Sequence, residues 1–393
     1  MTTERALVKD DACKNAVRAL HVFGTLNRGG AETWLLDVMR HSDRNTLEID
    51  VCVLSDKAGA YEEAFCAMGG RVLRCPLGRD PWRFGRALRR LLVAEQFDVV
   101  HSHVYLFSGF VLRAAWRAGV PQRIAHIHPV IDVKTNGLLR SAYAGWMRRW
   151  IVKYGTHHVA PTKTGLQAFW GPDWESGSPK SVIYNGVHAE RFLRTLDTAR
   201  VRRDFHLPDA ARIVLNVSRF AQHKRQGFLV EVAEQLIERS DDVYFVLIGA
   251  GDLRDEVRAT VSRKGLDERF RFVTGEPDID RYWLSADAFA FPSTNEGFGI
   301  VVAEAAAAGL PVVAQDIPGV REAAHACHDV TLLPLDTGAE EWSRVLEAAL
   351  LRGKLNDEER NKRLGEFPFT MDKSVAALER LYGIAGSASG STP

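Results

Sequence analysis

The chain has 393 residues, of which 46% are hydrophobic and 26% charged, and its 51 Lys and Arg nearly balance 50 Asp and Glu for a formal net charge of +1. This composition excludes collagen-like, disordered and disulfide-scaffold proteins. A balance so close to zero also argues against a nucleic-acid-binding protein, which is normally basic. At roughly 100–200 residues per domain, the length predicts two domains.

The small net charge conceals a difference between the halves. Residues 1–190 carry 25 Lys and Arg against 18 Asp and Glu, a net +7, whereas the rest of the chain carries 26 against 32, a net −6. The two halves therefore need separate explanations, and the basic first half suits an anionic partner.

The cysteines and the apolar runs bear on the compartment. Five cysteines are an odd number and include no C-x-x-C pair, which disfavours a disulfide framework or a zinc site. No run of about 18 apolar residues is present, and residues 1–14 lack the apolar core of a signal peptide. We expect a cytoplasmic protein, in contact at most with the inner surface of a membrane.

The predicted elements of the first half alternate short β-rich runs with amphipathic helical patterns. Strands are expected at residues 19–23, 49–54, 72–76, 98–103, 123–128 and 157–161, with helices such as 31–40 and 82–94 between them. This alternation predicts βαβ units and a parallel sheet.

A second series of the same kind follows residues 181–187. Its strands are expected at 212–217, 244–248, 270–273, 288–291, 311–314 and 330–333, and its helices include 226–238, 253–264 and 298–308. Because the rhythm lapses between them, we predict an α/β protein of two tandem Rossmann-like doubly wound domains, residues 15–187 and 188–368. Flexible tails are expected at 1–14 and 386–393, the latter rich in Gly and Ser.

Ligands of doubly wound sheets bind beyond the carboxyl ends of the strands, so motifs that follow strands carry the functional prediction. The strongest is P-S-T-N-E-G-F-G-I-V-V-A-E, residues 292–304. Its glycines, Gly297 and Gly299, permit close backbone approach at a helix N-terminus, which suits a phosphate. Glu296 and Glu304 lie about two helical turns apart and suit sugar or ribose hydroxyls. The alternative is an ordinary helix start with one acidic residue and one buried glutamate.

Two cations follow the strand at 212–217. Arg219 and Lys224 lie five residues apart and precede a helix, a placement that suits a diphosphate, with Arg as a planar fork and Lys as a point charge. The alternative is a pair of solvated loop cations.

In the first half, N-R-G-G-A-E at residues 27–32 follows the first strand. Gly29 and Gly30 permit close backbone approach at a helix N-terminus. The missing third glycine and Arg28 disfavour a dinucleotide fingerprint, and with it a dehydrogenase, although Asp56 follows the second strand.

Histidines gather after two later strands, as His101 and His103 and as His126 and His128. Alternation places each pair on one face of its strand. They form either part of the polar wall of a cleft, with His126 or His128 facing a reacting sugar, or a set of packed strand-end histidines.

Two further features have bland alternatives. Asp278-Ile-Asp280 resembles a metal-binding D-x-D pair, but a helix start explains it better. Residues 138–153 form an amphipathic helix bearing Tyr143, Trp146 and Trp150 among basic residues, which suits either an anionic lipid surface or core packing with a solvated basic face.

Together, the G-G-A-E loop, the Arg219/Lys224 pair and the E-x7-E block resemble the family-4 retaining glycosyltransferases of GT-B fold, in which two such domains face each other across a cleft. The segment V-I-Y-N-G-V-H at 182–188 is similar to the interdomain segment of that family, although His188 stands where Asp is more usual. The resemblance runs from about residue 19 to 382. It implies an acceptor-binding first domain, a nucleotide-sugar-binding second domain and a helix over 369–385 that returns to the first.

The resemblance also implies roles. Arg219 and Lys224 would neutralise the donor diphosphate, and Glu296 would face the sugar. Backbone N–H groups of Gly297, Phe298, Gly299 and Ile300 would contact the donor, Glu304 would hold the ribose, and Gly29 and Gly30 would approach the phosphates. His128, with His126 as the competitor, would lie near the sugar.

We therefore expect a hexosyltransferase that uses a nucleotide diphosphate sugar, uridine-linked, and retains the anomeric configuration, with no metal or other cofactor and no nucleic-acid partner. The acceptor would be a hydroxyl of a lipid-linked sugar, a saccharide or a small molecule, in polysaccharide, glycolipid or glycoconjugate biosynthesis. The alternatives are a GT-B-fold nucleotide-sugar epimerase and a non-catalytic sugar-nucleotide-binding protein.

Overall fold

The computed structural model describes residues 16–27, 29–128, 137–193, 197, 199–275 and 278–384. The expected tails at 1–14 and 386–393, and Arg28 of the first glycine loop, lie outside this set.

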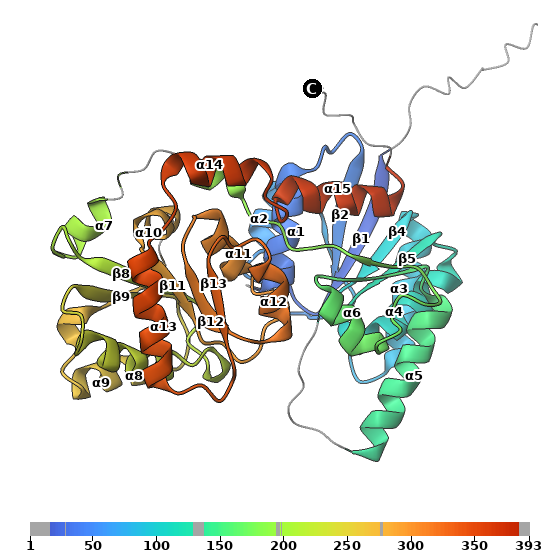
Figure 1. Cartoon of the computed structure of the whole chain (residues 1–393). Coiled ribbons are helices and arrows are strands. Elements are labelled where there is room, and N and C mark those ends of the chain that lie inside the picture. Colours follow the sequence, from blue (N-terminus) through green and yellow to red (C-terminus); the bar gives the residue numbers. More distant parts are fainter. Residues whose placement is uncertain are drawn as a thin grey trace, which may run out of the picture.

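The first unit is built on a seven-stranded parallel sheet of order β3-β2-β1-β4-β5-β6-β7. Figure 1 shows it beside the second unit, with β1, β2, β4 and β5 labelled. Its strands are β1 (Val17–Phe23), β2 (Leu47–Val53), β3 (Val72–Arg74), β4 (Val99–Ser102), β5 (Gln122–His126), β6 (His157–Ala160) and β7 (Lys180–Val182). Its helices are α1 (Gly30–His41), α2 (Glu62–Ala67), α3 (Pro81–Glu95), α4 (Ser108–Ala118), α5 (Leu138–Tyr154) and α6 (Lys163–Trp170), with a short 3-10 turn, η1, at Tyr105–Phe107.

The second unit is built on a six-stranded parallel sheet of order β10-β9-β8-β11-β12-β13. Its strands are β8 (Arg212–Val217), β9 (Val243–Ile248), β10 (Phe270–Val273), β11 (Ala288–Phe291), β12 (Val312–Gln315) and β13 (Val330–Leu333). Its helices are α8 (Gln226–Ile237), α9 (Arg254–Arg263), α10 (Asp280–Ser285), α11 (Ile300–Ala307), α12 (Pro318–Ala324), α13 (Ala339–Arg352) and α14 (Asp357–Gly365), with 3-10 turns η3 (Gln222–Lys224) and η4 (Asp267–Arg269). The linking segment holds η2 (Ala189–Leu193) and α7 (Ala199–Asp204), and the last helix is α15 (Met371–Tyr382).

Both sheets reverse their strand order beside their first strand, as doubly wound sheets do, and the expected fold class is confirmed. The strands are buried on both faces. Leu20 and Val22 of β1 pack with Phe84 of α3, whereas Ala19 and Phe23 pack with α1 and α15. Helices on both sides therefore explain the nearly continuous apolar strands.

One expected boundary differs for a physical reason. The helix predicted over 298–308 begins at Ile300, because Gly299 takes φ +67°, a left-handed conformation that interrupts a right-handed helix.

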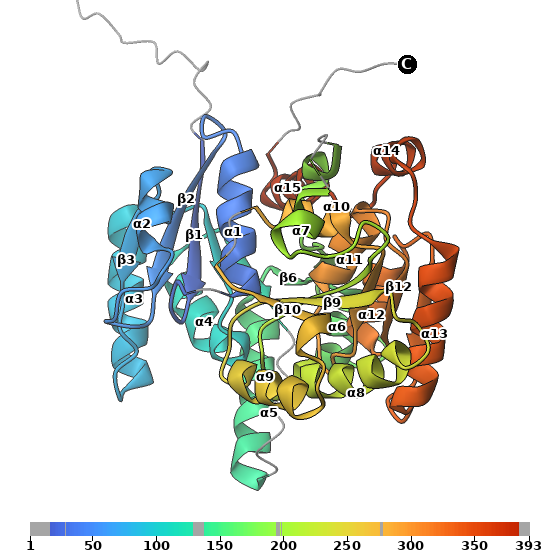
Figure 2. The same cartoon turned by 90° about the vertical axis from the view of Figure 1, so that its left-hand side faces the viewer.

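The two units are joined by two chain segments that run side by side. Val187 and Thr370 form a parallel bridge, in which the Val187 N–H donates to the Phe369 carbonyl (2.7 Å) and the Met371 N–H donates to the Val187 carbonyl (3.0 Å). After this second crossing, α15 lies beside α1 (Figures 1 and 2). The Trp34 indole N–H donates to the Ser374 hydroxyl at 2.9 Å, so the end of the chain is part of the first unit's core.

Gly186 is required where these crossings meet. A Cβ at this position would lie 2.5 Å from the Met371 Cα, which is backbone and has little freedom to move. We expect Gly186→Ala to lower the free energy of unfolding by about 1–3 kcal/mol, the usual cost of overpacking, as measured by urea denaturation.

The control is Gly145→Ala in the exposed middle of α5, where a Cβ meets nothing within 4 Å. A helical glycine replaced there should raise stability by about 0.5–1 kcal/mol. Equal stability of the Gly186→Ala variant and the unmutated protein would contradict the close packing of the two crossings.

Candidate active site

The segments that carry the predicted site residues leave the carboxyl ends of the strands in both units. In the first unit, Gly29 follows β1, His103 follows β4 and His128 follows β5. In the second unit, Arg219 and Lys224 follow β8 and Glu296 follows β11. Since β1, β4 and β5 are neighbours, as are β8 and β11, each group meets at one edge of its sheet.

The second unit brings the two strongest motifs into contact. The Lys224 ammonium and the Glu296 carboxylate form a close ion pair, with only 15% and 14% of their side chains exposed. The loops are also joined through backbone, because the Thr294 N–H donates to the His223 carbonyl at 2.8 Å. A cation and a carboxylate that are partly shielded from water at the mouth of a sheet form a polarised site for a charged, hydroxyl-bearing ligand.

Arg219 is placed differently from its predicted partner. Arg219 is exposed. Its backbone carbonyl accepts a hydrogen bond from the Gln226 side chain at 3.0 Å, and this bond anchors the loop to the start of α8. Of the two predicted cations, Lys224 is therefore the one that contacts Glu296 in this structure.

The loop after β9 also contributes to this edge. Gly249 and Gly251 take φ +151° and +146°, and a Cβ at either would collide with the Ser218 or Phe220 carbonyl. The two glycines thus permit the β9 and β8 loops to pack backbone on backbone. The sequence I-G-A-G directly after an apolar strand indicates such a close approach, and these glycines are missing from the predicted site.

The Glu304 carboxylate is paired with another side chain. It accepts a hydrogen bond from the Arg191 guanidinium at 3.1 Å, and Arg191 also lies 3.4 Å from Asp280. Burial raises the pKa of Glu304, while Arg191 opposes this shift. Asp280 of the D-x-D sequence is the first residue of α10 and is buried against this arginine. Sequence reasoning did not identify Arg191 as a site residue.

A cavity of about 270 Å³ lies between the units and reaches Glu296 and Gly297. Residues of α6 from the first unit and of the loops after β11 and β12 from the second line it, including Thr164, Gly165, Thr294, Asn295, Asp316 and Gly319. The cavity therefore lies between α6 of the first unit and the carboxyl edge of the second sheet, and Gly29, Gly30, His126 and His128 are not among its lining residues.

Glu322 of α12 ties the units together beside this cavity. Its buried carboxylate accepts hydrogen bonds from the backbone N–H groups of Lys163 (2.9 Å) and Thr164 (2.7 Å) at the start of α6. This is a charged cap supplied by the other unit, and it is also absent from the sequence prediction.

The glycine loop of the first unit begins α1. Gly29 is its N-cap in extended conformation, and a Cβ there would collide with the Glu32 carboxylate, whereas a Cβ at Gly30 would meet nothing within 4 Å. Burial raises the pKa of Glu32. The close approach at this loop is therefore between Gly29 and its own helix.

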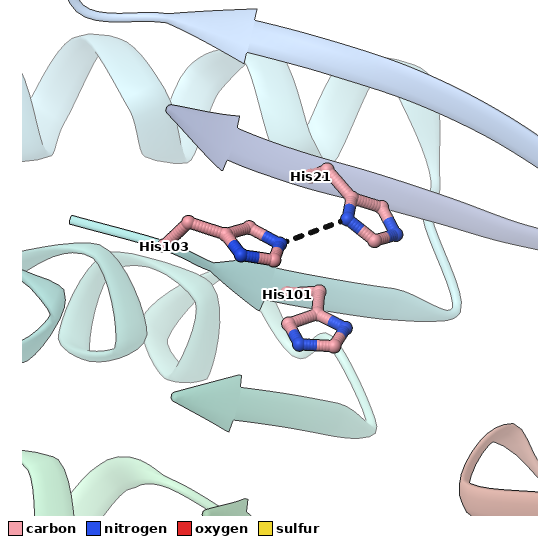
Figure 3. A group of neighbouring side chains, drawn as sticks. All are labelled: His21, His101 and His103. Atoms are coloured by element: carbon pink, nitrogen blue, oxygen red, sulfur yellow. Dashed lines mark hydrogen bonds between the residues drawn. The ribbon is translucent and has the colours of Figure 1, made fainter. Parts of the chain in front are cut away.

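The four predicted histidines come together with two residues that sequence reasoning missed, His21 of β1 and Tyr382 of α15. Figure 3 shows His21, His101 and His103 side by side on neighbouring strands, with His21 hydrogen-bonded to His103 at 3.0 Å. Tyr382 bonds to both His21 (2.9 Å) and His101 (2.7 Å). His21 occupies an inward position of a buried strand, which was its only sequence signal.

The histidines differ in exposure. His21, His101 and His126 are fully buried, with the His126 ring edge-on to Trp34, whereas His103 and His128 are partly exposed. Of the two competing candidates for the sugar, His128 is therefore the more exposed.

Burial keeps this cluster neutral. It lowers the pKa of His21 to about 3 and of His128 to about 4, and burial with mutual repulsion holds the pKa values of His101, His103 and His126 well below the usual range. Neutral histidines are suited to bind metals, and two trios within the cluster have nitrogens within 4.8 Å of one another. Most of these nitrogens, however, are hydrogen-bonded to other members of the cluster.

Comparison with known proteins agrees with this arrangement. A family model described as Glycosyltransferase Family 4 matches residues 28–191, and a model described as Glycosyl transferases group 1 matches residues 197–366. The putative glycosyltransferase EpsF of Bacillus subtilis (strain 168) is 28% identical over 374 residues, which are 94% of this chain and 97% of EpsF. A D-inositol 3-phosphate glycosyltransferase of Salinispora tropica is 28% identical over 93% of this chain and 83% of its own length.

The fold is also that of a solved structure. Anabaena Alr3699/HepE in complex with UDP aligns with a TM-score of 0.70 and 19% identity, over 93% of this chain and 95% of that one. Two Rossmann-like units of this kind define the GT-B fold. With one model matched on each unit, the chain belongs to glycosyltransferase family 4, as its motifs indicated.

The neutral histidine cluster predicts a specific loss of stability in acid. In the unfolded chain these histidines bind protons as the pH falls below about 6.5, whereas in the folded protein their lowered pKa values prevent it. The free energy of unfolding should therefore fall as the pH drops from 7 towards 4, by about 1.4 kcal/mol per pH unit for each such histidine.

Urea denaturation between pH 7.5 and 5 measures this slope. His101→Gln should make it shallower by about one proton, whereas His325→Gln, which removes an exposed histidine of the second unit, should leave it unchanged. Identical slopes in the two variants would show that the cluster does not govern the acid response.

Proposed function

We propose that this glycosyltransferase moves a hexose from a uridine diphosphate sugar to an acceptor hydroxyl with retention of anomeric configuration, in polysaccharide, glycolipid or glycoconjugate biosynthesis. The Anabaena protein of the same fold has been solved with UDP and with UDP-glucose, which supports a donor of this class. Family membership favours transfer over the epimerase and binding-protein alternatives.

The observation that carries the proposal is the Lys224–Glu296 contact at the inter-unit cavity. Transfer breaks the bond between the sugar and the diphosphate, so negative charge develops on the leaving group, and a fixed cation that meets this charge lowers the barrier. Lys224 would exchange its carboxylate for the diphosphate, and Glu296 would then accept hydrogen bonds from sugar hydroxyls. Lys224 would keep an anionic partner throughout, whereas Glu296 would exchange its cation for hydroxyl donors.

The surrounding groups have complementary roles in this proposal. Arg219 reaches the diphosphate from the exposed rim, and the N–H groups of Gly297, Phe298, Gly299 and Ile300 offer donors at the start of α11. Glu304, oriented by Arg191, accepts the ribose hydroxyls, while Gly29 and Gly30 bring the first unit's backbone towards the phosphates. His128 faces the sugar, with His126 behind it.

Retention follows if the acceptor hydroxyl attacks from the face that the diphosphate leaves, so that no carboxylate nucleophile is needed. Lys224, Arg219 and the α11 N-terminus would supply the positive charge that a metal ion supplies elsewhere. We therefore propose a reaction that needs no added metal.

We expect Lys224→Ala to lower kcat/KM for a UDP-hexose by about 10²–10³-fold, the usual loss for one preorganised charge-stabilising group. Proton NMR of a panel of UDP-hexoses with a chelator present follows turnover and the anomer of the product together. For the unmutated protein, we expect the product to retain the anomeric configuration and the rate to be the same with and without the chelator.

The matched control is Lys264→Ala, which removes a lysine from a close ion pair with Glu234 at the surface of the second unit. It should leave turnover unchanged. Full activity in Lys224→Ala would refute the role of this lysine, and an inverted product would refute the mechanism.

We also propose that the first unit contacts an anionic membrane surface. The structure describes no helix long and apolar enough to cross a bilayer. The support for a surface contact is a basic groove of about 530 Å³ between α3 and α4. Five arginines line it together with Trp82, namely Arg86, Arg89, Arg90, Arg113 and Arg117.

Aromatic residues of α5 lie next to Trp82 of this groove. Trp82 of α3, 45% exposed, lies 6.3 Å from Trp146 of α5, 40% exposed, between ring centroids, and Arg113 stacks over Trp82 at 4.9 Å. In both views α5 projects from the first unit (Figures 1 and 2). Exposed tryptophans among arginines are typical of the interface of anionic lipids.

We expect the double substitution Arg86→Gln/Arg90→Gln to weaken binding to phosphatidylserine-containing vesicles at low salt by roughly thirtyfold, because each basic residue near such a surface contributes about 1 kcal/mol. Co-sedimentation measures the partition. Arg203→Gln/Arg344→Gln removes the same charge from exposed positions outside the first unit and should have no effect. Absence of binding by the unmutated protein would end the membrane proposal.

A further inference from the structure

The hydrogen bonds of the histidine cluster form one unbranched chain. In order, they join His126 Nδ1 to His101 Nε2 (3.2 Å), His101 Nδ1 to the Tyr382 hydroxyl (2.7 Å), that hydroxyl to His21 Nε2 (2.9 Å), His21 Nδ1 to His103 Nε2 (3.0 Å), and His103 Nδ1 to His128 Nε2 (3.0 Å). Every histidine-to-histidine bond joins Nδ1 of one ring to Nε2 of the next. The chain therefore has a direction.

The ring geometry suits hydrogen bonds between these nitrogens. His21 and His103 have centroids 5.1 Å apart and planes 16° apart, and His103 and His128 have centroids 5.3 Å apart and planes 24° apart. The bonded nitrogens are much closer than the centroids, so they lie between rings that meet edge to edge. Since the N–H and the lone pair of an imidazole lie in the ring plane, each points at its neighbour.

A neutral imidazole has one N–H donor and one lone-pair acceptor, and the tyrosine hydroxyl donates one hydrogen and accepts another. Burial keeps these histidines neutral, as their lowered pKa values indicate. Each bond of the chain must contain a single hydrogen. The Tyr382 hydrogen must also lie in one of that hydroxyl's two bonds, because the residue is buried and no other partner is present among the described residues. The choice made at one bond therefore determines all the others. Either all five histidines carry their hydrogen on Nδ1 or all five carry it on Nε2.

The buried end of the chain distinguishes these two states. His126 Nε2 is buried and has no hydrogen-bond partner among the described residues. In the Nε2–H state this atom would be an orphaned N–H group, which is rarer and more costly than an unused lone pair. In the Nδ1–H state the unused hydrogen appears instead at the other end, on Nδ1 of the partly exposed His128.

We propose that the chain holds all five histidines as Nδ1–H tautomers and thereby makes His128 a fixed hydrogen-bond donor at the cleft. The other members of the chain, His103, His21, Tyr382, His101 and His126, are then positioning residues. This inference rests on the proposed function, in which His128 faces the sugar. The group that it recognises is an oxygen acceptor, such as a sugar or acceptor hydroxyl.

The proposal also defines what His128 does not do. Neutral His128 can accept a proton at Nδ1 only as the Nε2–H tautomer. That tautomer requires all five histidines to be Nε2–H, which creates the orphaned N–H at His126. His128 therefore binds and orients an oxygen and does not serve as the base that deprotonates the acceptor. The deprotonation has to be carried out by another group.

Nitrogen NMR of the full-length protein labelled with ¹⁵N-histidine tests the tautomers directly. Long-range proton–nitrogen correlations at pH 7.5 distinguish Nδ1–H from Nε2–H rings, and the exposed His206 and His325 provide the reference for histidines outside the chain. We expect five Nδ1–H rings. A mixture, five Nε2–H rings, or stoichiometric zinc in the purified protein with cluster nitrogens coordinated to it would overturn the proposal.

Two substitutions test the dependence of His128 on the chain. His103→Leu removes the hydrogen-bond partner of His128 and should release His128 from the pure Nδ1–H state. Tyr382→Phe should mix the tautomers of His101 and His126, because each tautomer then leaves one buried N–H without an acceptor. His128 should stay unchanged in Tyr382→Phe, because the Nδ1–H state of His21, His103 and His128 leaves only the lone pair of His21 Nε2 unused. An unaltered His128 spectrum in folded His103→Leu would refute the coupling. Tyr382→Phe keeps the aromatic ring and supplies the second test if His103→Leu does not fold. Unaltered tautomers of His101 and His126 in Tyr382→Phe would equally refute the coupling.

The activity of the same variants separates positioning from structure. If His103 acts through His128, His103→Leu should raise KM for the UDP-hexose in the unmutated background and have no further effect in His128→Phe. Additive losses would overturn the positioning role. The tautomers are measured without any substrate, so their outcome is independent of the Lys224→Ala test of the proposed function.

Discussion

The parallel direction of every strand is the constraint on which this molecule depends. Because all strands of a sheet run the same way, each loop that leaves a carboxyl end arrives at one edge, however far apart the segments lie in the sequence. Lys224 and Glu296 are 72 residues apart and become an ion pair because β8 and β11 are neighbours. His21 of β1 and His103, which directly follows β4, are 82 residues apart and meet for the same reason. The polar chemistry of both units is thus a consequence of strand order.

The second crossing of the chain adds a link that the sheets alone do not provide. After the bridge between Val187 and Thr370, α15 returns to the first unit and places the Tyr382 hydroxyl between His21 and His101. The helix that follows the second unit is therefore bonded to the polar core of the first. A displacement of α15 would disturb the cluster as well as the packing around Trp34.

Sequence reasoning was sufficient for what depends on local pattern. Strand–helix alternation predicted both parallel sheets but only six of the seven strands of the first, because β7 (Lys180–Val182) has only three residues and no apolar pattern. The position of Arg219, Lys224 and Glu296 after apolar strands predicted that they follow the carboxyl ends of those strands, as they do in the structure. It missed Tyr382, Arg191 and Glu322, because the partner of each lies more than a hundred residues away and no periodicity signals a contact of that range. It also placed the start of α11 two residues early, since the left-handed conformation of Gly299 depends on the loop around it. The roles of these residues in catalysis stay predictions, whereas their positions are structural facts.

The histidine cluster lowers the free energy that apolar burial contributes to folding. Positions such as His21 and His101 lie in fully buried strands where Val or Ile would gain transfer free energy and need no partner. Five imidazoles and one phenol are tolerated there only because each completes the hydrogen bond of the next. Among the described residues, the one buried atom of the cluster without a partner is His126 Nε2. Local conflicts between sequence and burial of this kind concentrate at functional sites. The cluster ends at His128, a partly exposed member of the chain. The free-energy cost of burying the polar groups behind it is consistent with the orientation that they impose on that one ring.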